Sequence, residues 1–120
     1  MLLRMQDANG RGPWKPGFSD KWVDNNRRFD LPALQEDFGV DFAPMVDAAF
    51  NRGLHLGTAV KGQEKFNMWF TPSERVKLAM FGYRIVDASS CEVLGETNWQ
   101  VIIGSPNPLS ELPLAPSVAA

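Results

Sequence analysis

Residues 83–104 read YRIVDASSCEVLGETNWQVIIG, and this stretch decides the fold class of the chain. Apolar and polar residues alternate within it in three short runs, at 83–88, 91–96 and 99–104. A period of two is typical of strands with one buried face. Tight polar turns separate the runs, and short turns join antiparallel neighbours. We therefore expect three consecutive antiparallel strands here.

Helical signals lie directly before these strands, in residues 71–82, TPSERVKLAMFG. Thr71 and Glu74 form a capping box, Pro72 suits the first helical position, and Gly82 suits the end of the helix. Further upstream, the patterns predict helices over 41–53 and 63–70 and strands over 2–6 and 54–60.

The order is strand, long loop, helix, strand, helices and three strands. It predicts an α+β fold with a mostly antiparallel sheet and two to three short helices. A chain of 120 residues suits a single domain, which we place at 1–104. The stretch 105–120 contains four prolines and one charged residue, so we expect a proline-rich extended or disordered tail.

Composition narrows the function classes. The formal net charge is −2 and the isoelectric point is near 5.3, which argues against direct nucleic-acid binding. One cysteine, Cys91, and one histidine, His55, can form neither an internal disulfide nor a zinc cluster, so no metal site is expected. The chain has no apolar run of transmembrane length and no secretory signal pattern. These features predict a cytoplasmic protein without membrane contact.

The loop at 7–18, DANGRGPWKPGF, is unusually rich in glycine, proline, basic and aromatic residues. In the strand predicted before it, Leu3 and Met5 alternate with Arg4 and Gln6, which indicates a half-buried strand with Arg4 on its polar face. The guanidinium group of Arg4 suits a phosphate or carboxylate. Gly10 and Gly12 allow backbone amides to approach an anion closely. Trp14 offers a ring face for stacking. Together they predict a site for an anionic ligand with a flat ring.

Each of these residues also has a purely structural interpretation. The glycines and prolines shape a loop in any case, and Arg4 has a possible ion-pair partner in Glu96. Trp14 and Trp22 are suited to anchor a long loop on the core. His55 faces away from the neighbouring leucines, where it lies either beside a cleft or on the open surface. The sequence leaves these alternatives open.

The N-terminal strand with Arg4 and the Gly-x-Gly-Pro-aromatic loop resemble a family of small phage and prophage proteins. The resemblance extends over 2–104 and includes Trp69-Phe70-Thr71, Gly82-Tyr83-Arg84-Ile85-Val86, Glu92-Val93-Leu94 and Gln100-Val101-Ile102. That family in turn resembles the ADP-ribosyltransferase superfamily, whose members bind NAD in a cleft between two small sheets.

The resemblance implies a role for particular residues. An arginine on the first strand holds the NAD phosphate or ribose, which matches Arg4, and Gly57-Thr58-Ala59 partly matches a small-residue strand motif. The family's catalytic glutamate comes from a Glu-x-Glu motif near the last strand. This chain departs from that motif: residues 96–100 read ETNWQ, with Gln100 near the expected position and Glu96 four residues earlier. A glutamine bonds ribose hydroxyls but carries no charge to stabilise an oxocarbenium-like transition state. The implied catalytic candidates are Gln100 and Glu96, and the implied NAD-binding residues are Arg4, Gly10, Gly12, Trp14, His55 and Thr58.

Two functions follow as hypotheses. The first is a phage-type, ADP-ribosyltransferase-like protein that binds or uses NAD and acts on a host protein, with defence proteins among the candidates. The alternative is a non-enzymatic inhibitor of a host defence complex, of the anti-CRISPR type. Such an inhibitor would use exposed basic and aromatic side chains, because these dominate binding hot spots. Its basic residues would be Arg11, Lys15, Lys21, Arg27 and Arg28. The NAD hypothesis requires Arg4 and Gln100 to line one cleft.

Overall fold

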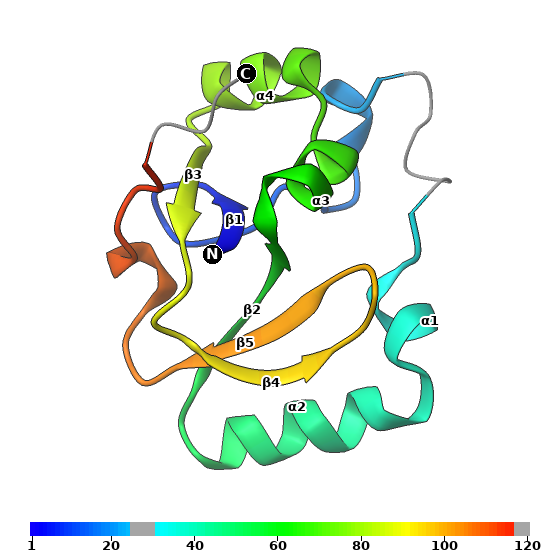
Figure 1. Ribbon diagram of the computed structural model, residues 1–120, viewed down its shortest axis with the longest axis vertical. Helices are drawn as coiled ribbons and strands as arrows, with labels where there is room; N and C mark the ends of the chain where they lie inside the picture. Colours follow the sequence, from blue (N-terminus) through cyan, green and yellow to red (C-terminus); the bar gives the residue numbers. More distant parts are fainter. Residues whose placement is uncertain (25–30, 117–120) are drawn as a thin grey trace.

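The computed structural model describes residues 1–24 and 31–116, and its elements follow the predicted order (Figure 1). The helices of the predicted stretches are α2 (Phe42–Asn51), α3 (Gly62–Trp69) and α4 (Pro72–Met80). A further short helix, α1 (Leu34–Phe38), was not predicted. The strands are β1 (Leu2–Gln6), β2 (His55–Lys61), β3 (Arg84–Asp87), β4 (Glu92–Glu96) and β5 (Val101–Ser105).

The strands lie in the order β3-β1-β2-β5-β4, and each neighbouring pair is antiparallel. The prediction of an α+β fold with an antiparallel sheet is thereby confirmed. In Figure 1, β1 and β3 lie in one half of the molecule with α3 and α4, whereas β4 and β5 lie in the other half with α2. The strand β2 runs from one half into the other.

The strand β2 has different partners along its length. Its first part, 55–59, pairs with β5, whereas pairing with β1 is limited to Leu2 opposite Lys61 and Leu3 opposite Val60. From Arg4 onward β1 continues beside β3 and no longer pairs with β2. The two strands therefore separate at Arg4, and this separation creates the space for the candidate site.

Both faces of β1 are buried. Leu3 and Met5 pack in a core with the aromatic residues of α3 and its surroundings, and Leu2 packs in a second core with residues of β2 and β5. Arg4 and Gln6 are buried as well, with 7% and 3% of their surface exposed. The prediction of a half-buried strand with Arg4 on its polar face is wrong, because the loop after β1 and the C-terminal segment cover that face.

This C-terminal segment belongs to the folded unit. The Leu109 carbonyl accepts a hydrogen bond of 2.8 Å from Gln6 Nε2, and the Leu109 side chain is buried in the second core. Two further backbone bonds join the segment to β3, from Asp87 N to Pro113 O at 2.8 Å and from Ala115 N to Ile85 O at 3.0 Å. The predicted boundary at residue 104 is therefore corrected, since the fold continues to 116. The rest of the expected tail, 117–120, lies outside the described residues.

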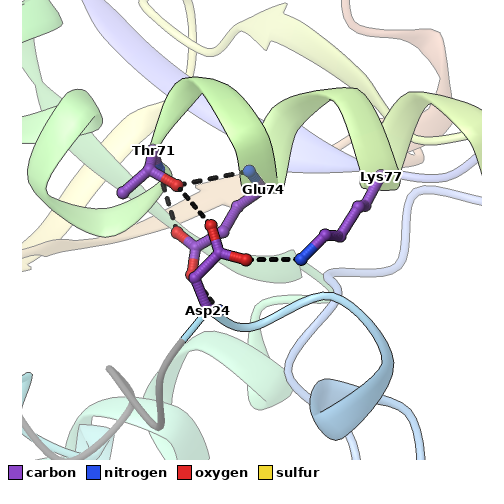
Figure 2. Close-up of polar contacts among 4 residues, drawn as sticks. All are labelled: Asp24, Thr71, Glu74 and Lys77. Carbon is purple, nitrogen blue, oxygen red and sulfur yellow. Dashed lines mark hydrogen bonds and ion pairs between the residues drawn. The ribbon is translucent and has the colours of Figure 1, made fainter.

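The predicted capping box at the start of α4 is confirmed, and it also holds the loop before residue 25 (Figure 2). One carboxylate oxygen of the fully buried Glu74 accepts the Thr71 amide proton, and the other accepts the Asp24 amide proton, both at 2.9 Å. The Asp24 carboxylate in turn accepts from Thr71 Oγ1 and from Lys77 Nζ. A carboxylate at the N-terminal end of a helix thus fixes the end of the loop to α4.

We expect the Asp24 contacts to stabilise the protein only above acidic pH. The hydrogen bond from Lys77 is the main cause that lowers the pKa of Asp24 below its ordinary value. The contribution is therefore complete above the unfolded-state pKa, about pH 4, and is lost as the pH falls through the lower folded-state pKa. In thermal melts, Asp24→Asn should be less stable than the wild type near neutral pH, and the difference should shrink on acidification. A difference that grows on acidification would contradict this assignment.

Candidate functional site

A cavity of about 680 Å³ opens where β1 and β2 separate. Its walls come from β1, the loop that follows β1, the segment that leads into α1, the middle of β2, the residues around the end of α3, and the residue before β5. The lining residues that bear on function are Arg4, Gly12, Trp14, Glu36, Thr58 and Gln100.

Arg4 connects the parts of the cavity wall. Its Nε donates to Gln6 Oε1 at 2.9 Å, Nη1 donates to the Thr58 carbonyl at 3.0 Å, and Nη2 donates to the Gly10 carbonyl at 2.8 Å. The side chain therefore bridges β1, β2 and the loop at the point where backbone pairing between β1 and β2 has stopped. One N–H on each of Nη1 and Nη2 is left over after these bonds, because a guanidinium group has five donors.

The charge of Arg4 is poorly compensated. All three acceptors are neutral, and no carboxylate in the described ranges forms an ion pair with it. Burial is the largest effect on its pKa and lowers it, while Cys91 and Asp7 oppose this shift only in part. The suggested partner, Glu96, is instead an exposed residue that pairs with Lys61 at 2.6 Å. A buried cation that is only partly compensated and has no ion-pair partner in the described ranges favours an anionic ligand.

Gly57 makes room for this guanidinium group. A Cβ at position 57 would lie 2.9 Å from Arg4 Cζ and Nη1 and 2.7 Å from Leu109 Cδ1. No side chain fits there while Arg4 keeps its position. The glycine that begins the small-residue stretch Gly57-Thr58-Ala59 thus has a physical reason in this chain, because the Arg4 guanidinium group lies directly against it.

The two loop glycines have different roles. The amide of Gly10 donates to the Asp7 carbonyl at 3.0 Å, so it is not free for a ligand, and its own carbonyl binds Arg4. Its φ of +81° and the 2.8 Å that would separate an added Cβ from Ser110 N make glycine necessary here. Gly12 lines the cavity, and an added Cβ would lie 4.0 Å from both terminal nitrogens of Arg4.

The two loop tryptophans have separate roles. Trp22 is fully buried and donates from Nε1 to the Pro13 carbonyl at 3.2 Å, so it anchors the loop as the structural interpretation requires. Trp14 is 38% exposed and lines the cavity, with its ring centroid 4.6 Å from that of Trp22. Trp69 and Phe70 add ring contacts to Trp14 at 6.3 Å each. The cavity therefore has an aromatic wall whose outermost ring is accessible.

Gln100 reaches the same cavity from the residue before β5 and is only 7% exposed. Its Nε2 donates to Asp37 Oδ2 at 3.1 Å, and Thr97 Oγ1 donates to the same oxygen at 2.5 Å. Arg4 and Gln100 thus line one cavity, as the NAD hypothesis requires, and Thr58 lies on its wall.

Two predicted site residues lie elsewhere. His55 is exposed at the far end of β2, opposite Ser105, and does not line the cavity. Glu96 is also absent from the lining, because its side chain is held on the surface by Lys61. The structure therefore does not bring Glu96 to the cavity as a second catalytic candidate.

Two acidic residues of α1 were missed by the sequence analysis. Glu36 lines the cavity and Asp37 contacts Gln100. The helix spans only five residues, LQEDF, which is too short for a helical period to be recognised. The adjacent acidic pair is the one local signal, and nothing in the sequence places it beside residue 100.

Of the basic residues that the inhibitor hypothesis requires, three lie in the described ranges. Arg11, Lys15 and Lys21 are exposed, and Lys15 Nζ lies 5.2 Å from the ring centroid of Phe18. Arg27 and Arg28 lie outside the described residues.

Comparison with known proteins adds no assignment: no family model matches the chain, and no curated protein and no solved structure shows significant similarity to it. Within 1–24 and 31–116, no helix is long and apolar enough to cross a membrane. Over the same ranges, no three His, Cys, Asp or Glu side chains gather in a way that would hold a metal ion.

Proposed function

We propose that the cavity between β1 and β2 binds NAD. In this proposal Arg4 contacts the phosphate groups, the accessible ring of Trp14 stacks against a base, and Gln100 bonds ribose hydroxyls. A pyrophosphate supplies the direct ion-pair partner that the described residues do not give to Arg4. A dinucleotide combines that charge with flat rings and hydroxyl groups, which are the chemical features that the lining side chains complement.

The buried guanidinium group of Arg4 is the observation that carries this proposal. It is 7% exposed, lines the cavity, keeps two N–H groups outside its three internal bonds, and has no ion-pair partner in the described chain. Burial of this charge costs stability in the free protein, and an anionic ligand would offset part of that cost.

The arrangement of strands supports NAD over other nucleotides. The resemblance to ADP-ribosyltransferase-like proteins implies a cleft between two small sheets, with an arginine on the first strand. Here the cavity lies where β2 changes partners between β1 and β5, and Arg4 is on β1.

We expect this chain to bind NAD but to catalyse ADP-ribosyl transfer only weakly. Gln100 lies near the position where the resemblance implies a glutamate, and its amide carries no charge to stabilise an oxocarbenium-like transition state. We therefore propose NAD binding with weak ADP-ribosyl transfer. The protein target, a host protein such as a component of a defence system, and the cytoplasmic location are proposed on the resemblance to phage proteins.

Calorimetry with NAD tests the proposal. We expect measurable binding to the wild type and about tenfold to a hundredfold weaker binding to Arg4→Met, since a hydrogen bond to a charged group contributes about 1.5–3 kcal/mol. Arg11→Met is the matched control, because it removes the same charge from an exposed residue of the same loop that does not line the cavity. Thermal melts establish that each variant is folded.

The inhibitor hypothesis takes first place if the folded wild type shows neither heat nor a thermal shift with millimolar NAD. Equal affinities of Arg4→Met and the wild type would instead show that NAD binds without the proposed phosphate contact. In either case the proposed site is wrong.

A further inference from the structure

The side chain of Gln100 is held by a carboxylate from a distant part of the chain. Asp37 of α1 lies 63 residues before Gln100, and its Oδ2 accepts hydrogen bonds from Gln100 Nε2 at 3.1 Å and from Thr97 Oγ1 at 2.5 Å. Thr97 Oγ1 in turn accepts the backbone amide proton of Gln100 at 3.3 Å. The three side chains form one connected group at the edge of the cavity.

This group fixes which end of the amide faces the ligand. An ionised carboxylate only accepts hydrogen bonds, so the amide must turn its NH₂ group toward Asp37. Gln100 Oε1 therefore points away from Asp37. No donor in the described ranges is bonded to this oxygen, and it is not among the fully buried polar atoms without a partner. Because Gln100 is nearly buried and lines the cavity, the cavity is the space from which Oε1 is accessible.

We infer that Asp37 is a positioning residue which holds Gln100 Oε1 toward the cavity as a hydrogen-bond acceptor for a ligand hydroxyl. The inference rests on the proposed function in one respect, since the hydroxyl is assigned to the ribose of NAD. Asp37 lies behind Gln100, so its carboxylate is one side chain farther from the ligand than the glutamate that the resemblance to ADP-ribosyltransferase-like proteins implies near this position. The pair thus selects ligands with a hydroxyl donor and does not place a carboxylate against the sugar.

The pair also explains why glutamate is unfavourable at this position in this chain. A second carboxylate at position 100 would face Asp37 at hydrogen-bond distance, and like charges that close cannot both stay ionised without cost. The residues at positions 37 and 100 therefore depend on each other, because the carboxylate of Asp37 requires a hydrogen-bond donor at position 100.

A charge exchange tests the pair without any ligand. Gln100→Glu should lower the melting temperature, more at about pH 7 than at about pH 5, because protonation of one carboxyl group relieves the repulsion. The double variant Asp37→Asn/Gln100→Glu restores one donor and one carboxylate in reversed positions, and should regain most of the lost stability. Asp47→Asn, an exposed carboxylate on α2, is the control partner for Gln100→Glu and should give no recovery. If the double variant regained no stability over Gln100→Glu, the inferred pairing of Asp37 with Gln100 would be wrong.

Ligand discrimination tests the positioning role. Calorimetry compares NAD with an analogue that lacks the ribose 2′-hydroxyl on the nicotinamide side or on the adenine side. We expect the wild type to prefer NAD over one of the two analogues by about tenfold. Asp37→Ala and Gln100→Leu should each remove that preference, and the double variant should lose no more than either single variant. A purely structural role of Asp37 would lower stability but leave the preference unchanged.

The outcomes separate this inference from the proposed function. If NAD binds through Arg4 but Asp37→Ala keeps the preference, the positioning role is wrong and the NAD site stands. If the wild type binds no NAD, the proposed function and the ribose assignment are both wrong. The charge exchange then decides whether Asp37 and Gln100 form the pair. The whole inference is supported if the double variant Asp37→Asn/Gln100→Glu regains stability and Asp37→Ala loses the preference for NAD over the analogue.

Discussion

Trp22→Ala is expected to lower the free energy of unfolding by about 3–5 kcal/mol, the range measured for removal of large buried aromatic side chains. Trp22 has no exposed surface and lies in the core with Phe66, Phe70 and Leu78. Its ring centroid is 5.6 Å from that of Phe70, and its Nε1 bonds the Pro13 carbonyl at 3.2 Å. Since the total free energy of unfolding of a domain is about 5–15 kcal/mol, this loss would be a large share of the stability.

The same substitution should weaken ligand binding, because Trp14 packs against Trp22 at the cavity wall. Urea unfolding gives the stability change, and calorimetry of the folded variant gives the change in NAD affinity. Trp22→Phe is the matched control: it keeps a ring but loses the bond to Pro13, so a smaller loss is expected, with about 1 kcal/mol from the hydrogen bond. A loss below about 1 kcal/mol for Trp22→Ala would show that the loop does not depend on this ring.

The elements of this fold were predictable where their signals are local. Alternation in 83–104 gave the three C-terminal strands, and Thr71 with Glu74 gave the start of α4, because strand period and capping depend on neighbouring residues. The strand order was not predictable in this way. That β1 lies between β2 and β3 follows from long-range pairing, as does the burial of both its faces.

The site was predictable only in part for the same reason. Arg4, Trp14 and Gln100 were selected by residue type and by resemblance, and they line one cavity. The alternation of Leu3 and Met5 with Arg4 and Gln6 indicated a polar face, but Arg4 and Gln6 bond each other inside the protein. Asp37 was missed because its relation to Gln100 exists only after the chain has folded.

At Gly57, a single added methyl group should displace the central contact of the NAD site. The Cβ of Gly57→Ala would lie 2.7 Å from Leu109 Cδ1 and 2.9 Å from the Cζ and Nη1 atoms of Arg4. Leu109 Cδ1 is the end of a flexible side chain and can turn away. The guanidinium group is tied to three acceptors, so its displacement breaks bonds, first of all the 3.0 Å bond to the Thr58 carbonyl.

We therefore expect Gly57→Ala to weaken NAD binding as strongly as Arg4→Met, about tenfold to a hundredfold, and to cost about 1–3 kcal/mol of stability through overpacking. Gly95→Ala is the matched control, because its Cβ would lie 2.5 Å from Cε of Met45 on α2, and neither Gly95 nor α2 lines the cavity. Both variants should lose stability in urea unfolding, but only Gly57→Ala should lose affinity in calorimetry. The double variant Arg4→Met/Gly57→Ala should bind no more weakly than Arg4→Met, since both changes act on one guanidinium group. A folded Gly57→Ala protein with wild-type affinity would separate NAD binding from the position of Arg4, and the cavity would lose its central contact.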